Sequence, residues 1–296
     1  MVTRYVYIPR STPPFYRQKE VSFEWNAGQA VSQKQKNVQA IHESFLKDNA
    51  DLKVLEVSTK SDQALGVEAS PFNLKLDLPF LKKSFPVENI YQASKVFAQG
   101  GPYYDILGLS PLEAKRDPRL EDSGELVHFS LDNRQYPIVP DMVFYAWIYI
   151  RAILQNGPLK RGLLDYDAFS DVEFNPARGS VCQAMACAIY VALAREKLLG
   201  RVQDFDQFYA LFSKKEYALI KAQSRPASMP VTMKTAAPAP VKKRAFAVGQ
   251  WIRHPVSGAG QIMKKDARTY LINFTLTGPK TMSKDYVETH CTPIAR

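Results

Sequence analysis

An acid, an amide and an amine lie close together in one short stretch of the sequence. Glu88 and Gln92 are four positions apart, and Lys95 follows three positions later. Residues three and four apart share a helix face, so these side chains should point the same way if the stretch is helical. Tyr91 lies beside them in an otherwise apolar sequence. Polar groups that converge next to an aromatic ring indicate a pocket rather than a core.

A second stretch, downstream of the first, is rich in cations. It contains Lys115, Arg116 and Arg119. Ammonium and guanidinium groups make charge-assisted hydrogen bonds to phosphate oxygens, so this stretch suits an anionic ligand such as a diphosphate. The alternative for Arg116 and Arg119 is a pair of exposed arginines on a helix surface.

Several strings of the sequence occur in the order found in a known family. They are residues 69–74 (Ala-Ser-Pro-Phe-Asn-Leu), 87–95 (Val-Glu-Asn-Ile-Tyr-Gln-Ala-Ser-Lys) and 114–119 (Ala-Lys-Arg-Asp-Pro-Arg). These strings resemble the NADAR domain, a family associated with NAD and ADP-ribose that includes N-glycosidases. Residues 97–103 and 169–176 resemble its antitoxin branch, whose members are paired with DNA ADP-ribosyltransferase toxins.

The resemblance implies cleavage of the N-glycosidic bond between ADP-ribose and a base amino group. In the antitoxin branch that base is guanine in DNA. The cleavage needs an acid–base residue and stabilisation of cationic character at the anomeric carbon. Glu88 is the acid–base candidate, and its alternative is an exposed carboxylate favoured by the helix dipole. A buried lysine with a lowered pKa can form a Schiff base with the opened ribose.

Three lysines compete for this covalent role: Lys75, Lys95 and Lys115. Lys75 is favoured because it matches the lysine that follows the early motif in NADAR proteins. The alternative for Lys75 is a strand lysine that faces water. The alternative for Lys95 is an ion pair with Glu88.

Further polar and aromatic residues are candidates for substrate binding. The full set is Ser70, Phe72, Asn73, Tyr91, Gln92, Lys95, Lys115, Arg116, Arg119, Trp147, Asp171, Glu173 and Asn175. The last three share one face if their segment is extended, and they would then bind ribose hydroxyls or a guanine amino group. Their alternative is a loop that caps the helix expected after residue 180. Trp147 and Tyr91 also fit a buried core.

Composition limits the class of protein. With 46% hydrophobic and 23% charged residues, the chain is typical of a soluble globular protein and needs no disulfide or metal to build a core. We expect reduced cysteines, a cytoplasmic location, no signal peptide and no membrane span, since the sequence lacks an apolar run of about 18 residues. The scattered histidines predict no metal cluster, and no cofactor is expected.

The charge is distributed unevenly. Residues 222–296 hold 12 lysines and arginines against 3 acidic residues, while the rest of the chain holds 27 against 26. A strongly basic end usually has a polyanionic partner such as DNA, and its alternative is a solubilising tail.

Apolar periodicity predicts a mixed α/β (α+β) NADAR-like domain rich in helices over residues 1–221. The expected strands are residues 4–8, 21–25, 52–59 and 72–78. The expected helices are residues 32–45, 87–97, 141–154, 180–199 and 204–221, with another starting at Ser110-Pro111. Residues 222–245 are expected to be a Pro/Ala-rich basic linker.

Residues 246–296 are expected to form a small all-β barrel. The string from Val248 to Gly260 resembles the Tudor-like (SH3-like) domain at the C-terminus of DNA-repair helicases, which binds protein or nucleic acid.

Three functions remain open. The first is a hydrolase that removes ADP-ribose from guanine in DNA and acts as an antitoxin. It would bind DNA through its basic end and have the cognate toxin as a further partner. The second is an N-glycosidase of a small phosphorylated amino-ribosyl metabolite, against which the basic end argues. The third is a non-catalytic module that binds ADP-ribose or the toxin.

Overall fold

The structure is a computed structural model that describes residues 1–176, 179, 181–213, 217, 245–254, 258–274, 278–284, 287–288 and 292–294. The chain forms two compact units, Met1–Arg225 and Pro226–Arg296, and each is described by itself.

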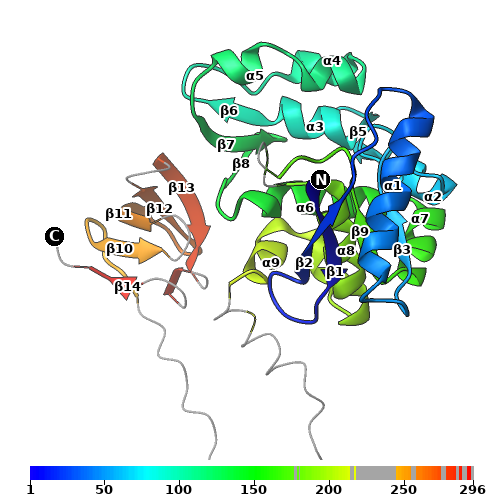
Figure 1. Cartoon of the computed structure of the whole chain (residues 1–296). Coiled ribbons are helices and arrows are strands. Elements are labelled where there is room, and N and C mark those ends of the chain that lie inside the picture. The colour runs from blue at the N-terminus through cyan, green and yellow to red at the C-terminus, as the bar shows by residue number, and fades with distance from the viewer. Residues whose placement is uncertain are drawn as a thin grey trace, which may run out of the picture. The chain divides into compact units, whose positions relative to one another are not determined.

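A four-stranded sheet with the order β2-β1-β9-β3 forms part of the first unit (Figure 1). Its strands are β1 (Val2–Pro9), β2 (Tyr16–Phe23), β3 (Val54–Glu56) and β9 (Ala168–Ser170). Strand β1 runs antiparallel to β2 and β9, whereas β3 runs parallel to β9. Alternation along β1 sends Val6 to a core shared with helix α1 (Val31–Leu46) and Tyr7 to the main core.

Two buried helices form the centre of the first unit. They are α6 (Asp141–Gln155) and α8 (Gln183–Arg195). They pack against each other, and α8 also packs against β1. Every residue of α8 from Ala184 to Leu193 is buried, because its many alanines let neighbouring elements approach on all sides.

A further group of short elements carries most of the polar strings found in the sequence (Figure 1). They are β4 (Lys75–Leu78), β5 (Lys83–Pro86), α3 (Val87–Ala93), β6 (Lys95–Phe97), η1 (Tyr104–Gly108), α4 (Pro111–Lys115), α5 (Arg119–Asp122), β7 (Leu126–Leu131) and β8 (Arg134–Tyr136). Strands β4 and β5 pair as a hairpin, and β6, β7 and β8 form an antiparallel sheet. Helix α3 packs against α4, η1 and α6, so it links this group to the central helices.

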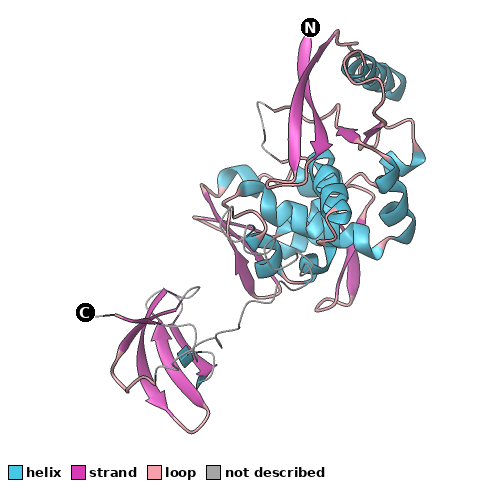
Figure 2. Ribbon diagram, turned by 90° about the horizontal axis from the view of Figure 1, so that it is seen from below, coloured by secondary structure: helices cyan, strands magenta, loops and turns pink. Residues whose placement is uncertain are grey.

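The remaining elements of the first unit are α2 (Ala64–Glu68), α7 (Gly157–Gly162), η2 (Leu163–Asp165), η3 (Leu199–Gln203) and α9 (Phe205–Ala210). Figure 2 shows its helices gathered in the middle, with strands around them.

The second unit is an antiparallel sheet with the order β13-β12-β11-β10-β14. Its strands are β10 (Trp251–His254), β11 (Gly258–Lys265), β12 (Thr269–Phe274), β13 (Gly278–Ser283) and β14 (Thr292–Pro293). The expected barrel is wrong in one respect, because the described strands do not close on themselves. The edge strand β14 is too short to pair further, and Pro293 has no N–H to donate.

The mixed α/β class of the first unit is confirmed, and the helices expected at residues 32–45 and 141–154 correspond to α1 and α6. The helix expected at residues 87–97 was too long, because α3 ends at Ala93 and Lys95 begins a strand. The linker expected at residues 222–245 lies outside the described residues, apart from its last one. None of the described helices is long and apolar enough to cross a membrane.

Candidate active site

Glu88 lies in the first turn of α3 and is 4% exposed. Pro86 precedes the helix, and the backbone N–H of Glu88 donates to the carbonyl of Pro71 at 3.0 Å, which ties the helix start to the preceding turn. One helical turn later, Gln92 donates from Nε2 to Oε1 of Glu88 at 2.9 Å. A buried carboxylate needs such partners because it has lost its hydrating water.

Lys115 reaches Glu88 from α4. Helix α4 begins with a capping box in which Ser110 and Glu113 bond each other reciprocally, and Lys115 lies in its last turn. The Lys115 ammonium lies 3.4 Å from Oε1 of Glu88 and 5.6 Å from the ring centroid of Phe72. The helix start, the Phe72 turn and α4 therefore meet at the Glu88 carboxylate.

Lys95 lies immediately after α3, at the start of β6. Its ammonium is 4.8 Å from the ring centroid of Tyr91. Burial lowers the pKa of Lys95 to about 8, Glu88 opposes that change, and the positive charge of Lys115 adds to it. A substantial fraction of this lysine is therefore a neutral amine near neutral pH, which is the form that attacks a carbonyl-type carbon.

Asp171 and Tyr145 form the other side of the same region. Burial raises the pKa of the Tyr145 hydroxyl well above its usual value, and both Glu88 and Asp171 raise it further. Burial and then the charge of Glu56 raise the pKa of Asp171 well above its usual value, while Lys115 lowers it. Lys115 pairs with Glu88 and lowers the pKa of Asp171, and both carboxyls raise the pKa of Tyr145. Glu88 and Asp171 therefore belong to one electrostatic cluster.

One acceptor in this cluster has no partner. Because Nε2 of Gln92 donates to Glu88, its Oε1 must point elsewhere, and this buried atom has no hydrogen-bond partner among the described residues. An unpaired buried acceptor is costly, so a donor supplied from outside the protein would stabilise this arrangement.

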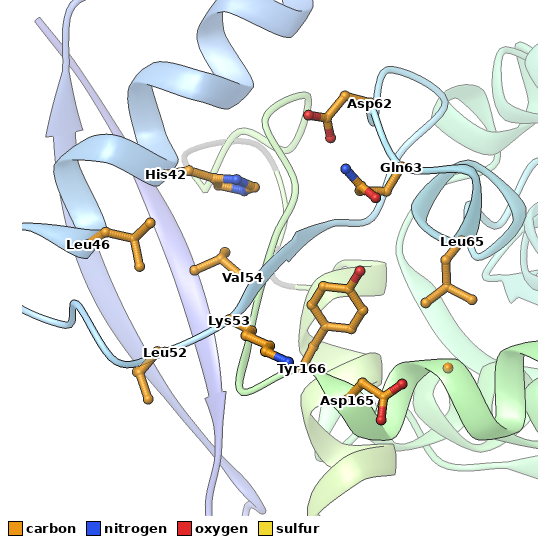
Figure 3. A pocket seen from close by; sticks show the side chains of 11 residues that line it. His42, Leu46, Leu52, Lys53, Val54, Asp62, Gln63, Leu65, Asp165 and Tyr166 are labelled. Carbon is orange, nitrogen blue, oxygen red and sulfur yellow. The ribbon is translucent and has the colours of Figure 1, made fainter.

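The cluster has the composition needed for N-glycoside chemistry. It combines a buried carboxylate, a second carboxyl that resists ionisation, and a lysine that loses its proton easily. Two surface clefts, of about 600 and 510 Å³, lie elsewhere in the first unit. The larger, lined by His42, Tyr166 and their neighbours, does not include Glu88 (Figure 3). We locate the site by its chemistry and not by cleft size.

Lys75, the lysine favoured from the sequence, lies outside this cluster. It occupies an exposed position of β4, where Leu76 and Leu78 alternate with it and face the core. Its surroundings are the smaller cleft, with Gln155 and Asn156. Lys95 is half-buried and its pKa is influenced by Glu88, whereas Lys75 is exposed; the choice of the reactive amine between them stays a prediction.

The cations downstream divide into two groups. Lys115 points at Glu88, whereas Arg119 forms ion pairs with Asp105 at 2.7 Å and Asp117 at 2.8 Å. The guanidinium of Arg119 also lies 4.4 Å from the ring centroid of Tyr103. With two carboxylates already bound, Arg119 is a weaker candidate for a diphosphate than its sequence position suggested. Arg116 is exposed at the C-cap of α4.

Three other expected residues have structural roles. Trp147 donates from Nε1 to the carbonyl of Val202 at 2.9 Å and packs between other rings, so it belongs to the core. Asn73 donates to the carbonyl of Val67 at 2.8 Å. Ser70 is buried in the turn before Phe72.

The segment after β9 is a turn and not a strand. The backbone N–H groups of Glu173 and Phe174 both donate to Oδ1 of Asp171. The three polar side chains therefore do not share one face of an extended segment. Asp171 is buried, Glu173 pairs with Lys34 at 3.0 Å, and Asn175 is half-buried. Sequence reasoning also missed Glu56 and Tyr145, whose only signal was a polar atom inside an otherwise buried strand or helix.

A comparison with protein families agrees with this description. The family model described as the DarT1-associated NADAR antitoxin matches residues 2–221. The match ends before the second unit, so the Tudor-like resemblance of residues 246–296 rests on their sequence alone. No curated protein sequence is significantly similar to the chain.

Proposed function

Because the chain belongs to the family of DarT1-associated NADAR antitoxins, we propose that it is a hydrolase that removes ADP-ribose from guanine bases in DNA. NADAR proteins are generally ADP-ribose glycohydrolases. The observation that carries the proposal is Lys95, which lies over the Tyr91 ring, has a lowered pKa and is influenced electrostatically by the buried carboxylate of Glu88.

In the proposed reaction the anomeric carbon of ADP-ribose passes from an imine with guanine to an imine with Lys95. The ribose ring of the modified base opens to an imine between its anomeric carbon and the guanine amino group. The neutral amine of Lys95 adds to that carbon and passes a proton to the Glu88 carboxylate, which returns this proton to the guanine nitrogen as the bond between carbon and guanine breaks. Water then adds to the lysine imine, which releases ADP-ribose and restores the amine of Lys95. Each step needs one proton moved by a nearby carboxyl, as Glu88 provides.

The aromatic and polar neighbours have positioning roles in this proposal. Tyr91 and Phe72 lie under the two lysines and would contact the base or the sugar. The unpaired Oε1 of Gln92 would accept a hydrogen bond from an N–H or O–H of the substrate. Lys115 would hold the Glu88 carboxylate in place through its ion pair.

We also propose DNA and the cognate toxin as partners. The support for DNA is the excess of basic residues after residue 221. The support for the toxin is the family, whose description names a toxin-associated antitoxin.

The test is to incubate the full chain with guanine-ADP-ribosylated DNA and to measure released ADP-ribose. We expect release by the wild type and a loss of at least about a hundredfold in Glu88→Gln, which keeps the shape but removes the acid. Glu121→Gln, at an exposed position of α5, is the matched control and should retain full activity. No release by the wild type, together with binding of ADP-ribose, would instead favour a binding module.

A further inference from the structure

The residues on both sides of Asp171 are held by one buried carboxylate. Ser170 donates from Oγ to Oε2 of Glu56 at 2.5 Å. The backbone N–H of Val172 donates to Oε1 of the same residue at 2.9 Å. Since Asp171 lies between these two anchors, the position of its backbone is fixed by Glu56.

Glu56 is itself firmly held. It ends β3, is fully buried and pairs with Ser170 across the parallel strands β3 and β9. The hydroxyl of Ser58 donates to its Oε1 at 2.7 Å. Burial raises the pKa of Glu56, and the three donors on its carboxylate lower it again because they replace part of the lost hydration.

A histidine completes the arrangement without making it a hydrolytic triad. His42 on α1 lies 2.8 Å from Oγ of Ser170, at the edge of the cleft in Figure 3. Because the hydroxyl hydrogen of Ser170 goes to Glu56, Nε2 of His42 must carry the proton in this bond. Ser170 is fully buried and bonds the carboxylate directly, so it cannot act as a nucleophile.

The side chain of Asp171 is surrounded by a defined set of groups. They are Glu56 from β3, Lys115 from α4, Cys182 ahead of α8, Tyr7 and Arg4 from β1, and Tyr145 from α6. Burial and the charge of Glu56 raise the pKa of Asp171, while Lys115 and the backbone N–H groups of Glu173 and Phe174 lower it. Two buried carboxyls in one region do not both ionise readily.

We propose that Glu56 is a positioning residue that fixes Asp171 in the site through both of its neighbours and, as a second buried carboxylate, keeps Asp171 uncharged. An uncharged Asp171 carries an O–H that can donate to a ribose or guanine oxygen. Glu88, by contrast, is paired with the Lys115 ammonium. Asp171 and Glu88 would then have different roles because their surroundings differ. The substrate role of Asp171 rests on the proposed function, whereas its coupling to Glu56 does not.

The experiment follows the carboxyl carbon of Asp171 by NMR in the full chain labelled with ¹³C-aspartate, with Asp171→Asn to identify the signal. In the wild type we expect Asp171 to stay protonated at pH 6. In Glu56→Gln we expect its titration to move to lower pH by about one unit or more, because a negative neighbour is gone. Ser170→Ala removes one anchor but leaves that charge, so its titration should stay close to the wild type.

Activity gives the second readout. Glu56→Gln and Ser170→Ala should each lower the rate of ADP-ribose release, since both loosen the segment that carries Asp171. An Asp171 that is ionised at pH 6 in the wild type overturns the proposal, even if Glu56→Gln does not fold. Equal titration in the wild type and Glu56→Gln overturns it as well. Because the titration needs no substrate, a failure of the proposed activity would be seen separately.

Discussion

Two lysines lie near one buried carboxylate, yet their surroundings make them chemically different. Lys115 is 54% exposed and forms an ion pair with Glu88, so it is suited to carry a positive charge. Lys95 is half-buried, lies over the Tyr91 ring and is repelled by Lys115. Burial penalises the charged form of an amine, so the same residue type serves as a cation at one position and as a nucleophile at the other.

Replacing Lys95 should abolish the reaction. We expect Lys95→Ala to lower ADP-ribose release by at least about a thousandfold, because no other amine of lowered pKa lies beside Glu88 in the described part of the chain. Borohydride reduction during turnover should attach ADP-ribose to the wild type and leave Lys95→Ala unlabelled. Lys75→Ala, at an exposed position of β4, is the control. Labelling that disappears only in Lys75→Ala would restore the assignment made from the sequence.

The pH dependence of the covalent step should follow Lys95. With a pKa of about 8, roughly a tenth of this amine is neutral at pH 7 and half at pH 8. Since only the neutral amine attacks, the single-turnover rate should increase with pH up to about 8 and then level off. Lys115→Ala removes a positive neighbour, so it should raise the pKa of Lys95 and move this rise to higher pH. A rate that does not change between pH 6 and 8 would contradict the role of Lys95.

At the level of elements, local signals were predictable and long-range pairing was not. The capping box at Ser110 and the apolar periodicity of α1 and α6 are local, and the sequence located these elements well. Helix α3 stops earlier than its periodicity predicts because Ser94 bonds back to the carbonyl of Ile90 and Lys95 pairs with Phe129 on β7. That pairing places Lys95 on a strand, whereas its spacing from Glu88 predicted a shared helix face.

The choice among the three lysines is not fixed by the sequence for the same reason, and the assignment of Lys75 stays a prediction. Lys75 and Lys95 both follow motif residues, and only burial distinguishes them. Burial depends on how β4, β6 and α3 pack, which is set by contacts distant in sequence. Helix spacing and the motifs identified Glu88, Gln92 and Lys115, and the structure brings Gln92 and Lys115 to Glu88, while their role in a site stays a prediction.

The contact between α1 and β9 should make stability depend on pH. Burial lowers the pKa of His42 to about 4, from an ordinary value of 6.5. Because the pKa of His42 is lower in the folded chain, the unfolded chain takes up the proton first as the pH falls. The contribution of neutral His42 to the free energy of unfolding is therefore complete above pH 6.5 and is lost as the pH falls towards 4. The difference corresponds to about 3 kcal/mol. His42→Gln, which can still donate to Ser170, should show a flatter loss of unfolding free energy over this range in urea titrations. An equal slope in both proteins would show that His42 does not titrate in this way.

For the whole molecule, the distribution of charge differs between the unit with the proposed catalytic site and the proposed DNA-binding end. The first unit contains the entire candidate site and is almost neutral, while the end of the chain carries the excess of positive charge. Exposed cations in the described part of the second unit lie around the turn between β11 and β12; they are Lys264, Lys265 and Arg268. Phosphate contacts of this kind depend on salt and do not depend on base sequence.

Removing residues 222–296 should therefore change affinity for long DNA and leave the chemistry unchanged. We expect the truncated chain to release ADP-ribose from a modified nucleoside at the rate of the full chain, because Glu88, Lys95 and Lys115 remain. On long modified DNA at low salt its KM should be at least about tenfold higher, and the difference should disappear as salt is raised, since each lost phosphate contact removes close to one counterion from the salt dependence. Replacing Lys264, Lys265 and Arg268 with glutamine in the full chain is the matched variant, and it should reproduce part of the effect if these cations contact DNA. An equal KM at low salt for the truncated and full chains would show that the basic end serves a different partner, and binding of the purified toxin to the second unit would then be the measurement that identifies it.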